Sequence, residues 1–191
     1  MAGTRVIVKI DKVKSTLAAI EDLTNKEVLV GIPATVSHRE NEEVGNAALG
    51  YIHEFGSPAA NIPARPFLIP GIKAKKQAIN SAFRRAAEAA LAGDRTAAEA
   101  ALNRAGIAGM NGAKERISSN IPPPLQPGTI RNRRRSRNTQ SRRESEKQYL
   151  DLIKYGADPG AAQAEAGIVS LINTGQLRRA ITWVTRKIKG T

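Results

Sequence analysis

The chain has 191 residues, enough for one domain of ordinary size with a core of its own. Its hydrophobic fraction of 41% is rich in alanine and its aromatic fraction is only 4%. We therefore expect a small core, long alanine-rich helices and some stability supplied by partner subunits. The formal net charge of +13 favours an anionic partner such as a nucleic acid, a membrane surface or an acidic protein.

Two absences narrow the class of protein further. The sequence contains no cysteine, which excludes disulfides and thiolate metal sites. No segment has the apolar length that predicts a signal peptide or a membrane span. We therefore expect the chain to be made and kept in the cytosol until it assembles with its partners.

The first residues predict a strand, a helix and a second strand. Residues 4–10 alternate and are rich in β-branched side chains, which is typical of a strand. Residues 11–23 space their apolar positions as a helix does, with Asp11 as a candidate N-cap. Residues 26–33 then predict a buried strand that ends at its glycine and proline.

A helix followed by a rigid elbow comes next. Residues 41–55 predict a helix that Gly56 ends. Prolines exclude a helix over residues 57–67 and hold that segment extended. One face of the predicted helix carries the apolar side chains Val44, Ala48, Tyr51, Ile52 and Phe55.

Residues 70–109 carry the longest helical pattern, with a candidate break at Gly93 and Asp94. A second, short helix is expected over residues 111–120, ended by the prolines that follow. The apolar stripe of the long helix comprises Ile72, Ile79, Phe83, Ala86 and Ala90.

Residues 121–148 differ in kind from the rest, because the arginine-rich part of this segment has almost no apolar side chains. Such a run cannot bury enough surface to offset the entropy of ordering it. We therefore predict an extended basic arm that lies outside the core. Its basic residues are Arg131, Arg133, Arg134, Arg135, Arg137, Arg142, Arg143 and Lys147.

The C-terminal segment predicts a return to the sheet. Residues 173–175 form a turn, and the alternating residues 180–188 predict a strand that pairs with the N-terminal strands. The predicted fold class is α+β, with a small mixed or antiparallel sheet packed against long alanine-rich helices, plus the extended basic arm. The expected domains are an α/β core with long helices over residues 1–120, the arm over residues 121–148, and a C-terminal helix and strand over residues 149–191.

Side chains that could carry chemistry do not form a catalytic pattern. A zinc peptidase needs a second histidine four residues after His53, where Ser57 stands, and His38 is the only other histidine. We interpret His53 and Glu54 as orienting the helix end through hydrogen bonds. We expect no metal, no cofactor and no enzymatic activity.

Three glycines need a separate interpretation. Gly106, Gly109 and Gly112 resemble a loose glycine-rich loop. A phosphate-binding loop needs a preceding strand and a following Gly-Lys-Ser/Thr, and the sequence has neither here. We interpret these glycines as helix connectors.

Two segments together resemble the hallmarks of the tail-completion or neck proteins of long-tailed bacteriophages. The first is GYIHEFGSPAANIPARPFLIPGI, residues 50–72, in which a helix ends in an HEFG corner and an IPARPF elbow leads into a long helix. The second is NTGQLRRAITW, residues 173–183, in which a turn precedes the final strand. The matching residues are His53, Glu54, Phe55, Gly56, Ile62, Pro63, Arg65, Pro66 and Phe67, then Thr174, Gly175 and Leu177.

The resemblance implies a structural virion protein at the joint between the DNA-filled head and the tail. It implies a homo-oligomeric ring, of six subunits by analogy with tail symmetry, with other phage neck and tail proteins as partners. Contact with packaged DNA is a further expectation, and a membrane partner is not. The implied location is the virion, after synthesis in the host cytoplasm.

The prolines of the elbow suggest how it acts. Pro63 and Pro66 stiffen the chain, so that Phe67 enters the core or an interface at a fixed angle. Arg65 is expected to be held outward or to pair with Glu54.

The basic arm has two open interpretations, because it is longer and richer in arginine than the resemblance implies. It could order on an acidic protein neighbour, or its arginines could contact phosphates with salt-sensitive affinity. The alternative function for the chain is therefore sequence-nonspecific nucleic-acid binding through the arm.

Overall fold

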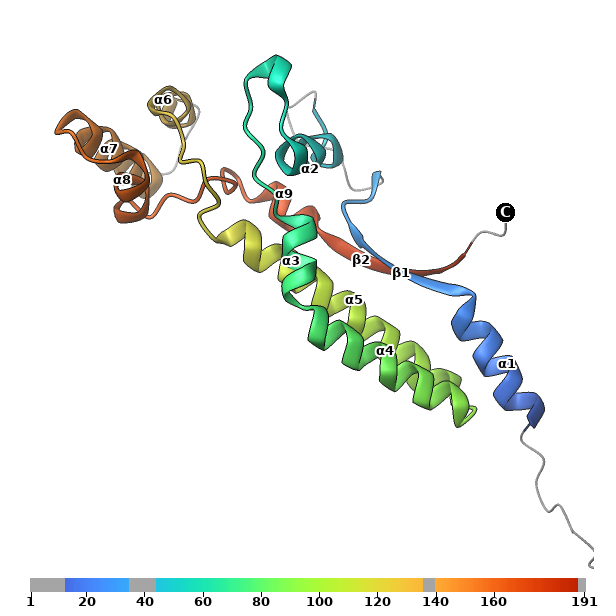
Figure 1. The fold of residues 1–191 in the computed structure, drawn as a ribbon. Coiled ribbons are helices and arrows are strands. Elements are labelled where there is room, and N and C mark those ends of the chain that lie inside the picture. Colours follow the sequence, from blue (N-terminus) through green and yellow to red (C-terminus); the bar gives the residue numbers. More distant parts are fainter. Residues whose placement is uncertain (1–12, 35–43, 136–139, 189–191) are drawn as a thin grey trace, which may run out of the picture. The chain divides into compact units, whose positions relative to one another are not determined.

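The computed structural model describes residues 13–34, 44–135 and 140–188, drawn in colour in Figure 1. The fold is α+β, with long helices and a small antiparallel sheet of two strands, as predicted. Several sequence expectations lie outside the described residues: the strand at residues 4–10, its neighbour Asp11, His38, the start of the helix expected from residue 41, and Arg137.

The described chain divides into two units. Unit 1 comprises residues 13–29, 76–108 and 183–188, and unit 2 comprises residues 30–34, 44–75, 109–135 and 140–182. The division differs from the predicted one because both units are built from segments that lie far apart in the sequence.

Unit 1 contains three helical segments and most of both strands, and the core between its helices is mostly alanine. Its elements are α1 (Val13–Thr24), most of β1 (Lys26–Gly31), α4 (Lys76–Leu91), the first part of α5 (Arg95–Ser118) and most of β2 (Thr182–Lys187). Small side chains of α1, α4 and α5 pack together, which allows a close approach of the helices. The buried alanines of these clusters are Ala19, Ala86, Ala90, Ala98 and Ala101.

The long helical pattern is interrupted where the sequence predicts a break. Gly93 adopts a left-handed conformation, with φ of 76°, between α4 and α5. Asp94 then caps α5, because its carboxylate accepts a hydrogen bond from the backbone N–H of Ala97 at 2.9 Å. The predicted stripe is correct at Ala86 and Ala90, whereas Phe83 lies at the edge of the packed face and is 42% exposed.

The final strand pairs with the second predicted strand. β2 lies antiparallel to β1, and Arg186 Nε donates to Glu27 Oε1 across the pair at 2.8 Å. Trp183 packs so closely on α5 that a Cβ at Gly106 would lie 2.8 Å from the Cδ2 atom of the indole. The predicted return of residues 180–188 to the sheet is therefore confirmed.

The interpretation of Gly106, Gly109 and Gly112 as helix connectors is wrong. All three lie inside α5, which runs without interruption from Arg95 to Ser118. The expected short helix over residues 111–120 is the last part of this same helix. Glycine is unfavourable in a helix interior, but Gly106 and Gly112 stand where another backbone or a large ring approaches the helix.

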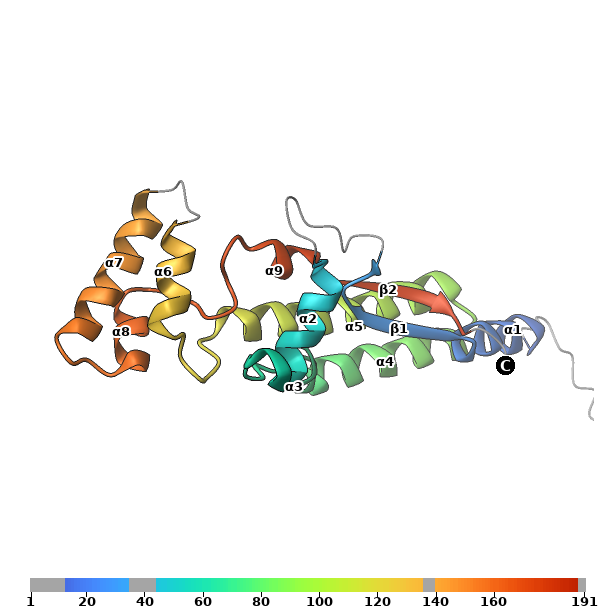
Figure 2. The same ribbon diagram turned by 90° about the horizontal axis from the view of Figure 1, so that it is seen from above.

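Unit 2 holds the remaining helices and has two hydrophobic clusters. Its elements are α2 (Asn46–Phe55), the 3₁₀ helix η2 (Pro58–Ala60), α3 (Leu68–Ala74), the end of α5, α6 (Pro127–Arg135), α7 (Gln140–Lys154), α8 (Pro159–Glu165) and α9 (Gln176–Ala180). The first cluster surrounds Phe67 and joins α3, α5 and α9. The second surrounds Tyr149 and joins α6, α7 and α8, which Figure 2 shows next to one another.

The prediction of an extended arm over residues 121–148 is wrong. Most of this segment is α6 and α7, which lie side by side (Figures 1 and 2). The arginine run is flanked by Ile130 on one side and Tyr149 on the other, both completely buried in the second cluster. The residues between Ile130 and Tyr149 are almost all polar, so their composition alone predicts disorder. The buried side chains at the two ends of this run supply the apolar contacts that stabilise the helices.

Much of the predicted apolar face of α2 lies at the surface of unit 2. The buried side of this helix carries Asn46, Gly50 and Glu54. Val44, Tyr51 and Phe55, which belong to the predicted apolar face, are exposed. Position 50 requires glycine for this packing, because a Cβ there would lie 2.8 Å from Ile32 Cδ1.

Candidate functional site: the elbow and the basic helices

Residues 56–67, which we call the elbow, begin where α2 ends. Gly56 has a φ of 78°, which favours glycine, and a Cβ there would lie 2.9 Å from the backbone nitrogen of Ala64. Ser57 and Ile62 then pair as an antiparallel bridge, with Asn61 in the left-handed conformation at the turn. Because η2 lies within this turn, the prediction that residues 57–67 are extended without any helix is wrong at residues 58–60, whereas residues 63–67 belong to no helix or strand.

Glu54 connects the end of α2 to the start of α3. Its Oε2 accepts hydrogen bonds from the backbone N–H groups of Phe67 and Leu68, each at 2.8 Å, and its Oε1 accepts one from Ile69 at 3.0 Å. The first N–H groups of a helix have no partner within the helix, and a carboxylate is favourable near that end. Glu54 therefore orients a helix end through hydrogen bonds, but this end is the start of α3 and not the end of its own helix, as the interpretation of His53 and Glu54 had it.

Arg65 is neither held outward nor paired with Glu54, so both parts of that prediction are wrong. Its side chain is buried, and Nε and Nη2 donate to the carbonyl oxygen of Pro123 at 3.1 and 2.8 Å. Nη2 also donates to Pro124 at 3.4 Å. Burial lowers the pKa of this guanidinium. Arg65 therefore fastens the elbow to the proline segment that precedes α6.

The two segments that carry the family resemblance meet in unit 2. Phe67 and Leu177 are both buried in the same hydrophobic cluster, and Gly50 of α2 faces both side chains. Gly175, with a φ of 78°, begins α9 and places Leu177 in this position. His53 lines one cavity together with Thr174, Gly175 and Leu177. The structure therefore brings His53, Phe67 and the second segment together.

The other residues of the elbow differ in how far they are exposed to solvent. Ile62 and Pro66 are half-buried, whereas Pro63 is exposed. Phe67 is only 1% exposed within this chain, which places it in the core rather than at an interface between subunits.

The outer face of α2 is an exposed apolar surface beside the elbow. Tyr51 and Phe55 are 67% and 57% exposed, and their ring centroids lie 4.8 Å apart. Val44, two residues before the helix begins, is also exposed. We call Tyr51 and Phe55 the aromatic face. Apolar side chains that gather on a protein surface mark interaction sites more often than isolated ones do.

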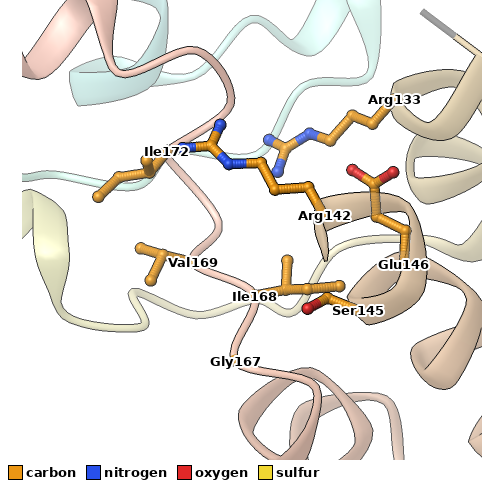
Figure 3. Close-up of a pocket in the computed structure, with 8 residues that line it drawn as sticks. All are labelled: Arg133, Arg142, Ser145, Glu146, Gly167, Ile168, Val169 and Ile172. Atoms are coloured by element: carbon orange, nitrogen blue, oxygen red, sulfur yellow. The ribbon is translucent and has the colours of Figure 1, made fainter. Parts of the chain in front are cut away.

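The basic residues of α6 and α7 form two sets with opposite orientations. In the inner set, Arg133 Nη2 donates to the carbonyl of Ser170 at 2.7 Å, and Arg142 Nη1 donates to that of Asn173 at 2.5 Å. Figure 3 shows both guanidinium groups beside the segment from Gly167 to Ile172, in a pocket that Glu146 also lines. The inner set therefore holds this segment against the two helices.

The outer set comprises Arg131, Arg134 and Arg135 of α6 and Arg143 of α7. All four are exposed, and together with Leu150 they line one pocket. No hydrogen-bond or ion-pair partner is found for them among the described residues. Lys147 of α7 is exposed as well but does not line this pocket.

Sequence reasoning missed a buried polar network between α8 and the segments around it. Gln163 Oε1 accepts from the backbone N–H of Leu125 at 2.7 Å, and its amide donates to Asn120 and to Ser170 Oγ, the latter at 2.8 Å. Tyr149 donates to the carbonyl of Leu125 at 2.7 Å. The only sequence signal for this network was Gln163, a single glutamine among the small residues of α8. A buried glutamine needs hydrogen-bond partners, so its burial would have predicted the network.

Within the described ranges, no three histidine, aspartate or glutamate side chains gather as a metal ion would require. The helices in these ranges also lack the length and apolar character needed to cross a membrane. No family model, curated protein or solved structure matches the chain. The resemblance to phage tail-completion proteins thus depends on the two short sequence segments alone.

Proposed function

We propose that the chain is a non-enzymatic structural protein of a tailed-phage virion, part of the neck or tail-completion ring that joins the head to the tail. Six copies would form the ring, and other neck and tail proteins would be its partners. The observation that supports this proposal is that the two resembling segments pack into one module around Phe67 and Leu177. Residues that matched separately in the sequence therefore serve one local structure.

The module contains buried residues that stabilise its structure and exposed residues that are available to a partner. Glu54 and Arg65 make buried hydrogen bonds within unit 2 and are not available for chemistry on a substrate. The aromatic face lies on the same helix as Glu54 but is exposed. We propose that this face is the surface through which the module docks in the ring, because burying two aromatic side chains provides a large apolar area.

Negative-stain microscopy of a phage lysate made without this chain tests the proposed function. We expect filled heads beside separate tails, and a copy of the wild-type chain supplied in trans should restore joined particles. Intact, infectious particles in the absence of the chain would overturn the proposal.

The aromatic face is tested in the same complementation experiment. Phe55→Glu should fail to restore joining while leaving the melting temperature of the purified chain nearly unchanged, because Phe55 is already largely in water. Phe83→Glu in unit 1 is the matched control, since Phe83 is 42% exposed but lies outside the aromatic face. Equal complementation by both variants would remove the aromatic face from the docking surface.

A second candidate function is sequence-nonspecific binding of nucleic acid. The net charge of +13 and the outer set of arginines favour it. Its test is the salt dependence of duplex DNA binding by the wild-type chain, which should be steep if phosphate contacts supply the affinity. Absence of binding at low salt would overturn this candidate and leave the ring proposal intact.

A further inference from the structure

We infer that the outer set, Arg131, Arg134, Arg135 and Arg143, is a binding site for the phosphodiester backbone of double-stranded DNA. This inference deepens the nucleic-acid candidate above and rests on it. It assigns the contact to four of the basic residues and excludes Arg133 and Arg142, which hold the fold.

The spacing of the four side chains places them on one surface. Arg131, Arg134 and Arg135 are three and four residues apart, so they share one face of α6. Arg143 comes from α7, and all four line a single pocket with Leu150. Four guanidinium groups therefore converge from two helices that share a hydrophobic cluster.

The local charge makes the site unfavourable without an anion. No acidic side chain lines the pocket, so the four positive charges repel one another with no opposite charge among them. The C-terminal end of α6 favours cations, which accounts for Arg134 and Arg135. Arg143, however, lies in the first turn of α7, where a cation is unfavourable and where no acidic residue is present. A bound polyanion would relieve this cost.

The residue types favour backbone contact over base recognition. A guanidinium presents a planar set of donors that suits a phosphate and that can bind it through two hydrogen bonds. The pocket contains no aromatic side chain on which an unpaired base could stack. It also has no asparagine or glutamine to read adenine, whereas an arginine can contact either a phosphate or the edge of guanine. The lack of a stacking side chain favours a duplex, and the comparison of two unrelated sequences below distinguishes phosphate contact from guanine contact.

Fluorescence anisotropy with a labelled duplex of about 30 base pairs, measured with two unrelated sequences over a range of salt concentrations, tests the site. The test variant replaces all four arginines with glutamine, a good helix former that removes charge but keeps length. The control variant carries Lys76→Gln, Arg84→Gln, Arg85→Gln and Arg104→Gln in unit 1, four exposed residues whose loss changes the net charge equally. Far-ultraviolet circular dichroism and the melting temperature confirm that both variants fold.

If the outer set makes four phosphate contacts, the slope of log K against log salt should fall in magnitude by roughly 3 to 4 in the test variant. At about 0.1 M salt the affinity should then fall by about 100-fold or more, equally for both sequences. The control should keep the wild-type slope.

The outcomes that overturn the inference are distinct from those that overturn the function. Equal slopes for the test variant and the wild type would overturn the site while leaving nucleic-acid binding in place. No duplex binding by the wild type at low salt would overturn the function itself. If polyglutamate of equal charge binds the wild type more tightly than the duplex, and the test variant loses it, the site recognises acidic protein and the DNA inference is wrong.

Discussion

The elbow and the basic helices differ in how their charged residues are used. At the elbow, Glu54 of α2 and Arg65 resemble candidates for chemistry, yet both are buried and bond to backbone groups of unit 2. In the basic helices, a run that resembles a solvated arm is folded, and only its inner arginines bond to the backbone. The comparison teaches that residue type and spacing do not reveal which charges face inward. A charged side chain faces inward where a backbone carbonyl or N–H group without another partner is available to bond with it.

The largest expected effect distinguishes Phe67, the last residue of the elbow, from Phe55, which directly precedes the elbow. Phe67→Ala should lower the free energy of unfolding by about 3–5 kcal/mol, because it removes a buried aromatic ring from the core of unit 2. Phe55→Ala, its control, should change that free energy by less than about 0.5 kcal/mol, since Phe55 is largely exposed. Urea denaturation monitored by circular dichroism measures both. Similar losses for the two variants would contradict the division of the elbow into core and surface.

Glu54 provides the next largest effect. Glu54→Ala leaves three backbone N–H groups at the start of α3 without their acceptor, in a buried place. We expect a loss of about 2–3 kcal/mol, since buried donors without a partner are costly. Glu115→Ala removes a carboxylate of the same unit that is 63% exposed and pairs with Lys75 at 2.7 Å. Glu115→Ala should therefore lower the free energy of unfolding by less than about 1 kcal/mol in the same urea experiment.

A small difference between these two glutamate variants would show that the bonds to α3 are not what stabilises the elbow. Glu54→Gln refines the test, because one acceptor oxygen remains and the charge is removed. Its effect should lie between those of the wild type and Glu54→Ala.

Much of the fold could be predicted because it depends on local patterns. The final strand, the break at Gly93 and the end of α2 at Gly56 follow from alternation, from glycine conformation and from helix-ending rules. The break and the helix end each require φ > 0, which few residues other than glycine adopt easily. Such signals lie within a few residues of the feature that they determine.

The predictions that failed depended on partners far along the sequence. Arg65 could not be placed without Pro123, nor Arg133 without Ser170. The sequence pattern placed Tyr51 and Phe55 on one apolar face of α2 without showing that this face is exposed, whereas the buried face relies on Gly50 for close packing. Apolar periodicity does not distinguish a core face from an interaction face.

Replacing a glycine of α3 or of α6 with alanine should change the free energy of unfolding by a smaller amount. Gly71 of α3 contacts α5 so closely that a Cβ would lie 2.6 Å from the carbonyl oxygen of Gly112 and 2.7 Å from the Cα of Ala113. Gly71→Ala should therefore lower the free energy of unfolding by about 1–3 kcal/mol. Gly128→Ala in α6 is the control, since nothing lies within 4 Å of a Cβ there. It should leave stability unchanged or raise it by up to about 1 kcal/mol.

The melting temperatures of the two alanine variants should therefore shift in opposite directions or by clearly different amounts. A Gly71→Ala variant as stable as the wild type would mean that α3 and α5 can separate at little cost. The elbow would then be a less rigid platform for the aromatic face than the hydrogen bonds of Glu54 suggest.

The smallest effect compares neighbouring arginines of the inner and outer sets. Arg133→Ala removes the bond to the Ser170 carbonyl and should cost about 1.5 kcal/mol, because a buried acceptor loses a charged donor. Arg134→Ala removes the same charge from an exposed position and should change stability by less than about 0.5 kcal/mol. Duplex DNA binding should show the reverse order, with Arg134→Ala reducing the salt slope by about 1 and Arg133→Ala leaving it unchanged. If one variant lost both stability and affinity while the other lost neither, the two sets would not be separable, and the basic helices would act as one surface.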